Sequence, residues 1–431
     1  MGICGSKGPK PAGEPKPTAP PPSGVNDEGV PPEPPEPPDD TGPTDARAHA
    51  REHVHVLTHD GHSAVVCSAY FSPDGTKIVS ASYDQTVRVQ NAVTGECELI
   101  LEEHSGTVRS ACFSPDGAMI VSASEDKTAR AWNATTGECE LTLEGHSDGV
   151  TSVSFSHDGT KIVSASWGGT VRVWNAVTAE CELTLEGHIS EVYSACFSPD
   201  GTKIVSGSSD DTVRVWNAAT GECELTLQEH DGMVFSVSFS RDGARIVSAS
   251  WDGTVRVWNA ATGVCELMMQ GHRSGVYSAC FNRDGTKIVS GSSDGTMAVW
   301  NAATGECELV LQEHTGGVSS ACFSPDGATL VSASYDKTVR VWIALTPEQV
   351  AKAAAPTIAF SVIELTGKEL PMTTLSALHT VGELKQEVAA ASGMRAEQVR
   401  LVLKGEVLDD ESRTLGEHGV EAGSQVNAVS Q

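Results

Sequence analysis

Residues 187–228 read GHISEVYSACFSPDGTKIVSGSSDDTVRVWNAATGECELTLQ, and this pattern returns every 42 residues through the middle of the 431-residue chain. Clusters of Gly, Asp and Asn divide the unit into four runs of β-branched and small apolar residues, as expected for short strands. Seven units each keep one phenylalanine in register, at Phe71, Phe113, Phe155, Phe197, Phe239, Phe281 and Phe323. A four-stranded unit with a period of about 40–45 residues is typical of a propeller blade. The sequence therefore predicts a mainly β fold, with a seven-bladed β-propeller over residues 49–345.

The way in which the ring closes is also visible. No fourth strand follows Trp342, whereas an unpaired strand-like stretch at residues 53–59 precedes the first unit. Closing a ring of sheets removes exposed strand edges. We therefore expect residues 53–59 to supply the outer strand of the seventh blade.

The repeated unit resembles the WD40 repeat. The resemblance rests on Gly187-His188, Val192, the Ser198–Gly201 turn, Ser206, Asp210 and Trp216-Asn217, and it extends over about 290 residues. It implies that His188, Ser206, Asp210 and Trp216 hydrogen-bond in series and lock the strands of their blade. We call this set the tetrad.

Two blades depart from the tetrad. The first has Gln90 in place of the tryptophan, and the third has Gly168 in place of the aspartate. We expect these blades to be held less rigidly. All seven blades carry near-copies of the remaining residues, whereas an active site is asymmetric. We therefore interpret the repeated His, Ser and Asp as scaffold and expect no catalytic residue and no enzyme.

Seven of the 22 aromatic residues form the candidate partner-binding set. They fall in two slots of the repeat that the scaffold does not reserve for a ring, because other blades have Ser or Thr there. Successive turns of a meander alternate between its two ends, so both slots open at the same end. Exposed rings that gather at one place are typical of an interface hot spot. The set is Tyr83, Trp167, Tyr193, Phe235, Trp251, Tyr277 and Tyr335.

Most of the 12 cysteines also recur in register. Cys97, Cys139, Cys181, Cys223, Cys265 and Cys307 share one slot, and Cys112, Cys196, Cys280 and Cys322 share another, in which two blades have serine. We interpret them as small packing residues. His53, His55 and His59 suggest a metal site, but His55 stands in a packing slot, so we expect no metal and no cofactor.

Residues 1–48 are rich in proline and are predicted to be a disordered tether. The first residues fit an acylation pattern, with Gly2 as the myristoyl site and Cys4 as a palmitoyl site. Two acyl chains anchor a protein far better than one. No run of residues is long and apolar enough to span a bilayer. We therefore expect a cytoplasmic protein, held at the cytoplasmic face of a membrane.

A second domain is predicted at residues 357–429, after a helical linker at 346–356. Leu365-Thr366-Gly367-Lys368, Arg400-Leu401-Val402 and Arg413-Thr414-Leu415 are similar to ubiquitin. The resemblance implies a small α+β domain of the β-grasp type. It also implies an apolar recognition patch at Leu365, Val402 and Val429. Since the sequence ends at Gln431 without a Gly-Gly tail, we expect this domain to be bound by receptors and not to be conjugated.

Together these features predict an adaptor. The propeller would hold a protein or peptide client, and the ubiquitin-like domain would recruit the proteasome or ubiquitin-receptor proteins. With 29 basic and 57 acidic residues the net charge is −28, which disfavours nucleic acid as a partner. The alternative is a WD40 signalling scaffold with no role in the ubiquitin pathway.

Overall fold

The computed structural model describes residues 54–344 continuously, and then 357–358, 361–364, 375–376, 384–386, 399–403, 406–408 and 425–430. The predicted tether at 1–48 and the linker at 346–356 lie outside these residues, so their boundaries stay predictions. No helix in the described part is long and apolar enough to cross a membrane.

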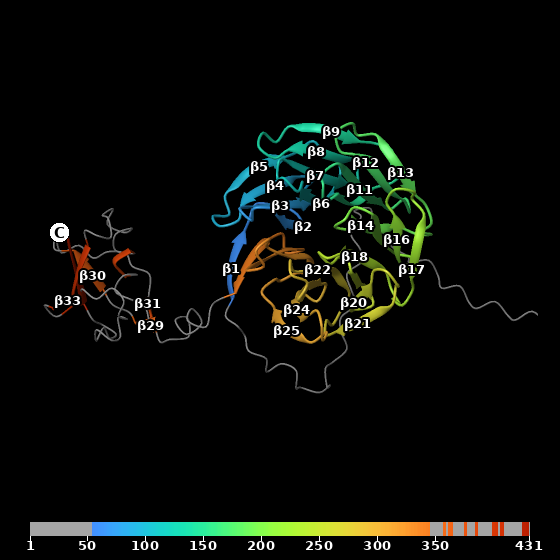
Figure 1. Ribbon diagram of the computed structural model, residues 1–431. Coiled ribbons are helices and arrows are strands. Elements are labelled where there is room, and N and C mark those ends of the chain that lie inside the picture. The colour runs from blue at the N-terminus through green and yellow to red at the C-terminus, as the bar shows by residue number, and fades with distance from the viewer. Residues whose placement is uncertain are drawn as a thin grey trace, which may run out of the picture. The chain divides into compact units, whose positions relative to one another are not determined.

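Residues 54–344 form seven four-stranded antiparallel sheets arranged as blades around a common axis (Figure 1). The strand nearest the axis comes first in each of blades one to six, and the outermost comes fourth. The strands are, in blade one, β2 (Val66–Phe71), β3 (Lys77–Ser82), β4 (Val87–Asn91) and β5 (Cys97–Leu101); in blade two, β6 (Val108–Phe113), β7 (Met119–Ser124), β8 (Ala129–Asn133) and β9 (Cys139–Leu143); in blade three, β10 (Val150–Phe155), β11 (Lys161–Ser166), β12 (Val171–Asn175) and β13 (Cys181–Leu185); in blade four, β14 (Val192–Phe197), β15 (Lys203–Ser208), β16 (Val213–Asn217) and β17 (Cys223–Leu227); in blade five, β18 (Val234–Phe239), β19 (Arg245–Ser250), β20 (Thr254–Asn259) and β21 (Cys265–Gln270); in blade six, β22 (Val276–Phe281), β23 (Lys287–Ser292), β24 (Met297–Asn301) and β25 (Cys307–Leu311); and in blade seven, β26 (Val318–Phe323), β27 (Thr329–Ser334), β28 (Val339–Ala344) and β1 (Val54–His59). The predicted seven-bladed propeller is confirmed.

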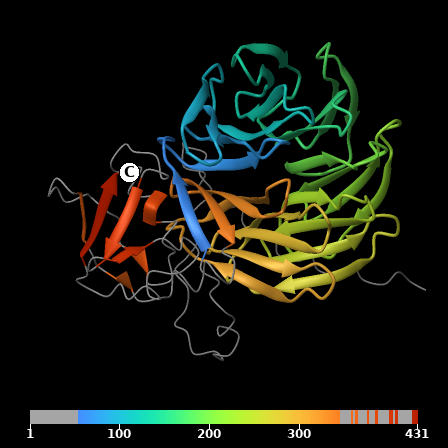
Figure 2. The same ribbon diagram turned by 60° about the vertical axis from the view of Figure 1, so that its left-hand side comes forward.

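The two ends of the propeller sequence meet in blade seven. Strand β1 pairs antiparallel with β28, from Val54 opposite Ala344 to His59 opposite Val339, and lies along the edge of the last blade (Figure 2). The predicted closure is therefore confirmed. Pairing β1 with β28 joins the first described strand to the last blade and so closes the ring.

The hydrophobic core lies between neighbouring blades. One cluster joins Val163, Val173 and Leu185 of blade three to Val192, Ile204 and Trp216 of blade four. Valine and isoleucine fit the pleated, doubly covered surface of such a sheet. Each fully buried side chain of this size contributes about 1.5–3 kcal/mol of transfer free energy. The blades thus stabilise one another by face-to-face packing.

The tetrad forms in blade four as the resemblance implies. Trp216 Nε1 donates to Ser206 Oγ at 2.8 Å, Ser206 Oγ lies 2.7 Å from His188 Nε2, and His188 Nδ1 lies 2.8 Å from Asp210 Oδ2. Blades two, five and seven keep the His–Asp distance at 2.7–2.8 Å. Blade six is looser, with 3.4 Å between His272 and Asp294.

The two departures from the tetrad have visible consequences. In blade one, Gln90 Nε2 reaches only the carbonyl of Asp60 at 3.4 Å, and its buried Oε1 has no partner among the described residues. In blade three, His146 Nδ1 has a hydrogen bond only with Thr170 Oγ1, at 3.4 Å, among the described residues, where other blades also offer a carboxylate. Both blades therefore lack one hydrogen bond of the tetrad. Their lower rigidity stays a prediction.

The eleven cysteines in the described part are free thiols. Those of the innermost strands pack as predicted: Cys112, Cys196, Cys280 and Cys322 each direct Sγ to a carbonyl of the next innermost strand. Those that begin the outermost strands differ, because Cys97, Cys181 and Cys223 are exposed. The packing interpretation is wrong for these three, since the outer edge of a blade faces solvent.

The C-terminal domain contains a mixed sheet. Its order is β30-β34-β32-β33, with β30 (Ser361–Glu364) parallel to β34 (Gln425–Ser430), and with β32 (Val399–Leu403) and β33 (Glu406–Leu408) antiparallel. A separate pair joins β29 (Thr357–Ile358) and β31 (Leu375–Ser376). Helical residues 384–386 bury Leu384 completely. Strands and a helix in this order agree with the predicted α+β domain.

Candidate protein-binding face of the propeller

Every innermost strand carries a β-bulge at its second residue. The pairing of the first two strands shifts register there, for example between Val192 and Ser194 and between Val234 and Ser236. A bulge turns a side chain away from the regular alternation of the strand. The seven bulge residues are Cys67, Arg109, Thr151, Tyr193, Phe235, Tyr277 and Ser319.

The second aromatic slot lies beside the bulge in each blade. The first residue of the turn between the second and third strands donates its backbone N–H to the residue two positions before the bulge. Examples are Trp167 N to Gly149 O at 3.0 Å and Trp251 N to Met233 O at 2.9 Å. This hydrogen bond fixes the two slots next to each other. The prediction that both slots open at one end of the propeller is therefore confirmed.

Five of the predicted rings form one continuous group, which we call the aromatic cluster: Tyr193, Phe235, Trp251, Tyr277 and Tyr335. Phe235 lies 4.9 Å from Tyr193, 6.0 Å from Trp251 and 5.3 Å from Tyr277, between ring centroids. Tyr277 also stacks on Tyr335 at 5.7 Å. Edge-to-face and stacked rings at these distances stabilise one another. The cluster is thus a preformed surface contributed by blades four to seven.

Two glycines leave space for the rings of Trp167 and Trp251 to lie against the backbone. A Cβ on Gly149 would come within 2.9 Å of the Trp167 ring, and one on Gly275 would overlap the Trp251 ring. Trp251 is 37% exposed and is the most open of the seven rings. The other six are half-buried. The set is therefore part packing and part surface.

The remaining two rings are held by Arg109, the bulge residue of blade two. Its guanidinium lies 4.7 Å from the Tyr83 ring and 4.9 Å from the Trp167 ring, within the range of a cation–π contact. It donates to Tyr83 Oη at 2.6 Å and to Glu125 Oε1 at 2.7 Å. Burial raises the pKa of Tyr83 to about 12, so the phenol is protonated at neutral pH. Arg109 thereby joins blades one, two and three into a polar arc next to the aromatic cluster.

One carboxylate at this end was missed by the sequence interpretation. Glu191 Oε2 accepts hydrogen bonds from Ser190 Oγ and Ser209 Oγ, each at 2.5 Å. These bonds hold the pKa of Glu191 below its ordinary value. The pKa of nearby Tyr193 is raised, mainly by burial and also by the negative charge of Glu191. The signal in the sequence was Ser209, which stands in an aromatic slot. Together with Tyr193, this carboxylate is suited to a cationic group of a partner.

The other predicted sites are described less fully. Leu365, Gly2 and Cys4 lie outside the described residues. In the sheet, Val402 pairs with Asn427 and Arg400 pairs with Val429. Directly opposed residues share a face and alternate positions along a strand also share one, so positions 402 and 429 lie on the same face. Within the described part, no group of three His, Cys, Asp or Glu is placed to hold a metal.

Comparisons with known proteins give three matches to protein-family models. The model for the WD domain, G-beta repeat, matches residues 52–91, 95–133 and 305–342. The model for the fourth β-propeller of WDR90 matches residues 149–282. The ubiquitin family model matches residues 358–431. A search of curated proteins finds no match.

Proposed function

The chain is a WD40-repeat β-propeller protein with a ubiquitin-family domain at residues 358–431, and from this premise we propose that it is a non-catalytic adaptor. The two kinds of domain fit a protein-interaction scaffold. In our proposal the aromatic cluster and its polar arc bind a protein client. The ubiquitin-like domain recruits the proteasome or ubiquitin-receptor proteins.

The observation that carries the proposal is the aromatic cluster. Five rings from four blades contact one another at one end of the propeller, although the equivalent positions of other blades include Ser, Thr, Cys, Arg and Glu. Rings of this kind supply a large contact area with little loss of side-chain entropy on binding. Interface hot spots are enriched in Trp, Tyr and Arg, and all three residue types occur here.

The client site is tested by replacing Trp167 and Trp251 with alanine. We expect the double variant to lose the proteins that co-purify with the full chain, while the propeller still unfolds in one transition. The matched control is Val264→Ala, which removes a side chain that is 59% exposed in a turn at the opposite end. Equal recovery of partners by the double variant and by the control would exclude the aromatic cluster and the polar arc as the client site.

Recruitment through the ubiquitin-like domain is tested by Val402→Asp. A carboxylate on the shared face of β32 and β34 should prevent docking on an apolar patch. We expect proteasome or ubiquitin-receptor proteins to be lost, while the propeller client stays bound. If no such protein co-purifies with either form, the chain is a signalling scaffold whose ubiquitin-like domain serves only for interaction.

We also propose that the adaptor acts at the cytoplasmic face of a membrane, through acyl chains on Gly2 and Cys4. The support is the sequence pattern at residues 1–6. Gly2→Ala should move the protein from the membrane fraction to the soluble fraction, and Cys4→Ser should do so in part. An unchanged distribution of the Gly2→Ala variant would exclude the anchor.

A further inference from the structure

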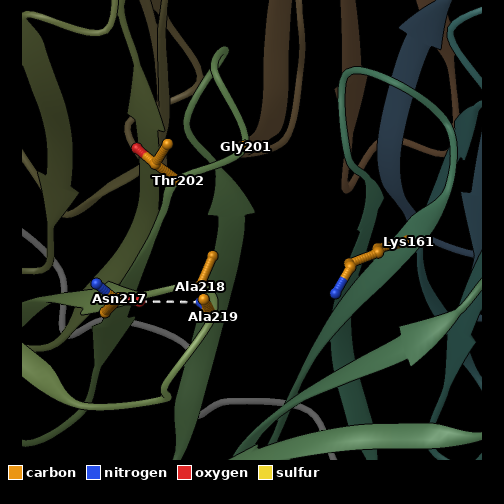
Figure 3. Close-up of a pocket in the computed structure, with 6 residues that line it drawn as sticks. All are labelled: Lys161, Gly201, Thr202, Asn217, Ala218 and Ala219. Carbon is orange, nitrogen blue, oxygen red and sulfur yellow. Dashed lines mark hydrogen bonds between the residues drawn. The ribbon is translucent and has the colours of Figure 1, made fainter.

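An open pocket of about 390 Å³ lies between blades three and four. It is formed by the turns that join the first and second strands and the third and fourth strands, so it opens at the end opposite the aromatic cluster. Lys161 of blade three stands on one side, and residues of blade four stand on the other (Figure 3). The blade-four residues are Gly201, Thr202, Asn217, Ala218 and Ala219.

The pocket is open because blade three lacks a proline. In four blades a turn proline covers the equivalent glycine of the next blade, at 3.6–3.8 Å from the position that a Cβ would take. These pairs are Pro73 with Gly117, Pro115 with Gly159, Pro199 with Gly243, and Pro325 with Gly75. Blade three has His157 at this position. A Cβ on Gly201 would meet no atom within 4 Å.

The equivalent pocket between blades five and six is filled by a side chain of the protein itself. Arg245, which is the counterpart of Lys161, donates from Nη2 to Gly285 O at 2.6 Å and from Nη1 to Ala302 O at 2.7 Å. Its guanidinium also lies 5.0 Å from the Phe281 ring. Blade five lacks the proline as well, because Arg241 stands there. The filled pocket between blades five and six therefore shows that a guanidinium group fits this space.

Lys161 does not fill its own pocket in this way. Its Nζ bonds Glu182 Oε2 at 2.7 Å within blade three, and lysine lacks the planar fork with which arginine reaches two acceptors. Among the described residues, no hydrogen bond reaches the carbonyl oxygens of Gly201 or Ala218, which are the counterparts of Gly285 and Ala302. Ala218 is 6% exposed, whereas Ala302 under Arg245 is 1% exposed.

We infer that the pocket between blades three and four binds an arginine side chain of a partner protein. The guanidinium donates to the carbonyl oxygens of Gly201 and Ala218, as that of Arg245 does to their counterparts. Glu224, which accepts from Asn217 Nδ2 at 3.0 Å, and Glu182 balance the charges of Lys203 and Lys161 at the rim. The net charge of −28 favours a cationic partner. The site is independent of the client on the aromatic cluster.

The test uses the full chain and two small probes, N-acetyl-arginine methylamide and N-acetyl-lysine methylamide, followed by amide NMR shifts. We expect the arginine probe to shift Gly201 and Ala219 saturably in the millimolar range. The lysine probe should bind at least about tenfold more weakly, because it lacks the fork. Lys161→Arg should abolish the response by filling the pocket from within. His157→Pro should abolish it by covering Gly201.

Two controls keep the outcome decisive. His157→Ala leaves the pocket open and should respond like the unchanged protein. Arg245→Lys should open the second pocket and add shifts at Gly285. Equal shifts with both probes, or a response that survives both Lys161→Arg and His157→Pro in folded variants, would overturn the site. Trp167→Ala in the polar arc and Trp251→Ala in the aromatic cluster should leave this response unchanged.

Discussion

Blades three and four have similar sequences but differ at the aspartate position of the tetrad. In blade four, Asp210 accepts from His188 Nδ1 at 2.8 Å, from Ile189 N at 3.1 Å and from Thr212 Oγ1 at 2.6 Å. In blade three the same place holds Gly168, and the Ser147 hydroxyl stands close to the space of the missing side chain. The scaffold thus tolerates loss of a buried carboxylate in one blade when neighbours on both sides keep theirs.

The missing carboxylate bears on the ionisation of His146 in blade three. The hydrogen bonds of Asp210 hold its pKa well below the ordinary value against the opposing effect of burial. His146 has no carboxylate, and burial together with the nearby Arg172 lowers its pKa to about 4. His146 is therefore neutral at physiological pH. A repeated position shows its role best where one copy has lost it.

The largest effect is expected when blade four is given the defect of blade three. Asp210→Ala leaves His188 Nδ1 and the N–H of Ile189 without their acceptor, at a cost of about 3 kcal/mol in the free energy of unfolding. Gly168→Ala in blade three should cost about 1 kcal/mol or less, because no bond is lost there. Denaturant midpoints measure both. Asp231→Ala, an exposed aspartate in a nearby loop, is the control. Equal costs in the two blades would mean that the tetrad does not stabilise blade four.

The pH dependence of stability should also differ between blades three and four. The folded-state pKa of His146 is lowered from 6.5 to about 4, so the unfolded chain binds the proton more readily between these values. The contribution of neutral His146 to the free energy of unfolding is full above pH 6.5 and is lost as the pH falls toward 4. This contribution has an upper bound of roughly 3 kcal/mol. The carboxyl groups of Asp126 and Asp210 have lowered pKa values, so their contribution to stability is lost only below about pH 4.

Gly168→Asp tests this window. The new carboxylate should accept from His146 and raise stability at pH 7 by about 1–2 kcal/mol. Its advantage over the unchanged protein should grow between pH 6.5 and 4, because His146 then no longer resists protonation. Titration of the denaturant midpoint against pH gives the difference between the two proteins. Parallel curves across this window would show that His146 does not set the pH dependence.

Much of the fold follows from the period of the sequence. Seven copies without an insertion predict the blades, the closing strand and the two broken tetrads, because each depends only on which residue occupies which position. The β-bulges could not be predicted, since they depend on the register of two strands. The contacts of Arg109 with Tyr83 and Trp167 could not be predicted for the same reason, because they cross three blades.

The pocket between blades three and four also required the structure. His157 is visible in the sequence as a departure from proline, but its consequence lies in the next blade, at Gly201. His59 is similar: it is buried at 4% exposure with both ring nitrogens unpartnered among the described residues, at the position where other outer strands end in leucine or methionine. Such effects arise from contacts between blades, and these contacts cannot be inferred from the sequence of a single repeat.

The smallest effect is expected from repairing blade one. Gln90→Trp should restore the indole donor to Ser80 Oγ, which already lies 2.8 Å from His62 Nε2. It also removes the buried amide oxygen that has no partner among the described residues. Gly61 is the counterpart of Gly187, which lies against the Trp216 ring in blade four. We expect a gain of about 1 kcal/mol in the free energy of unfolding, read from denaturant midpoints. Gln90→Leu is the matched control, since it removes the amide without adding a donor. If both variants gain equally, the benefit comes from burying an apolar side chain, and the fourth link of the tetrad adds nothing in this blade.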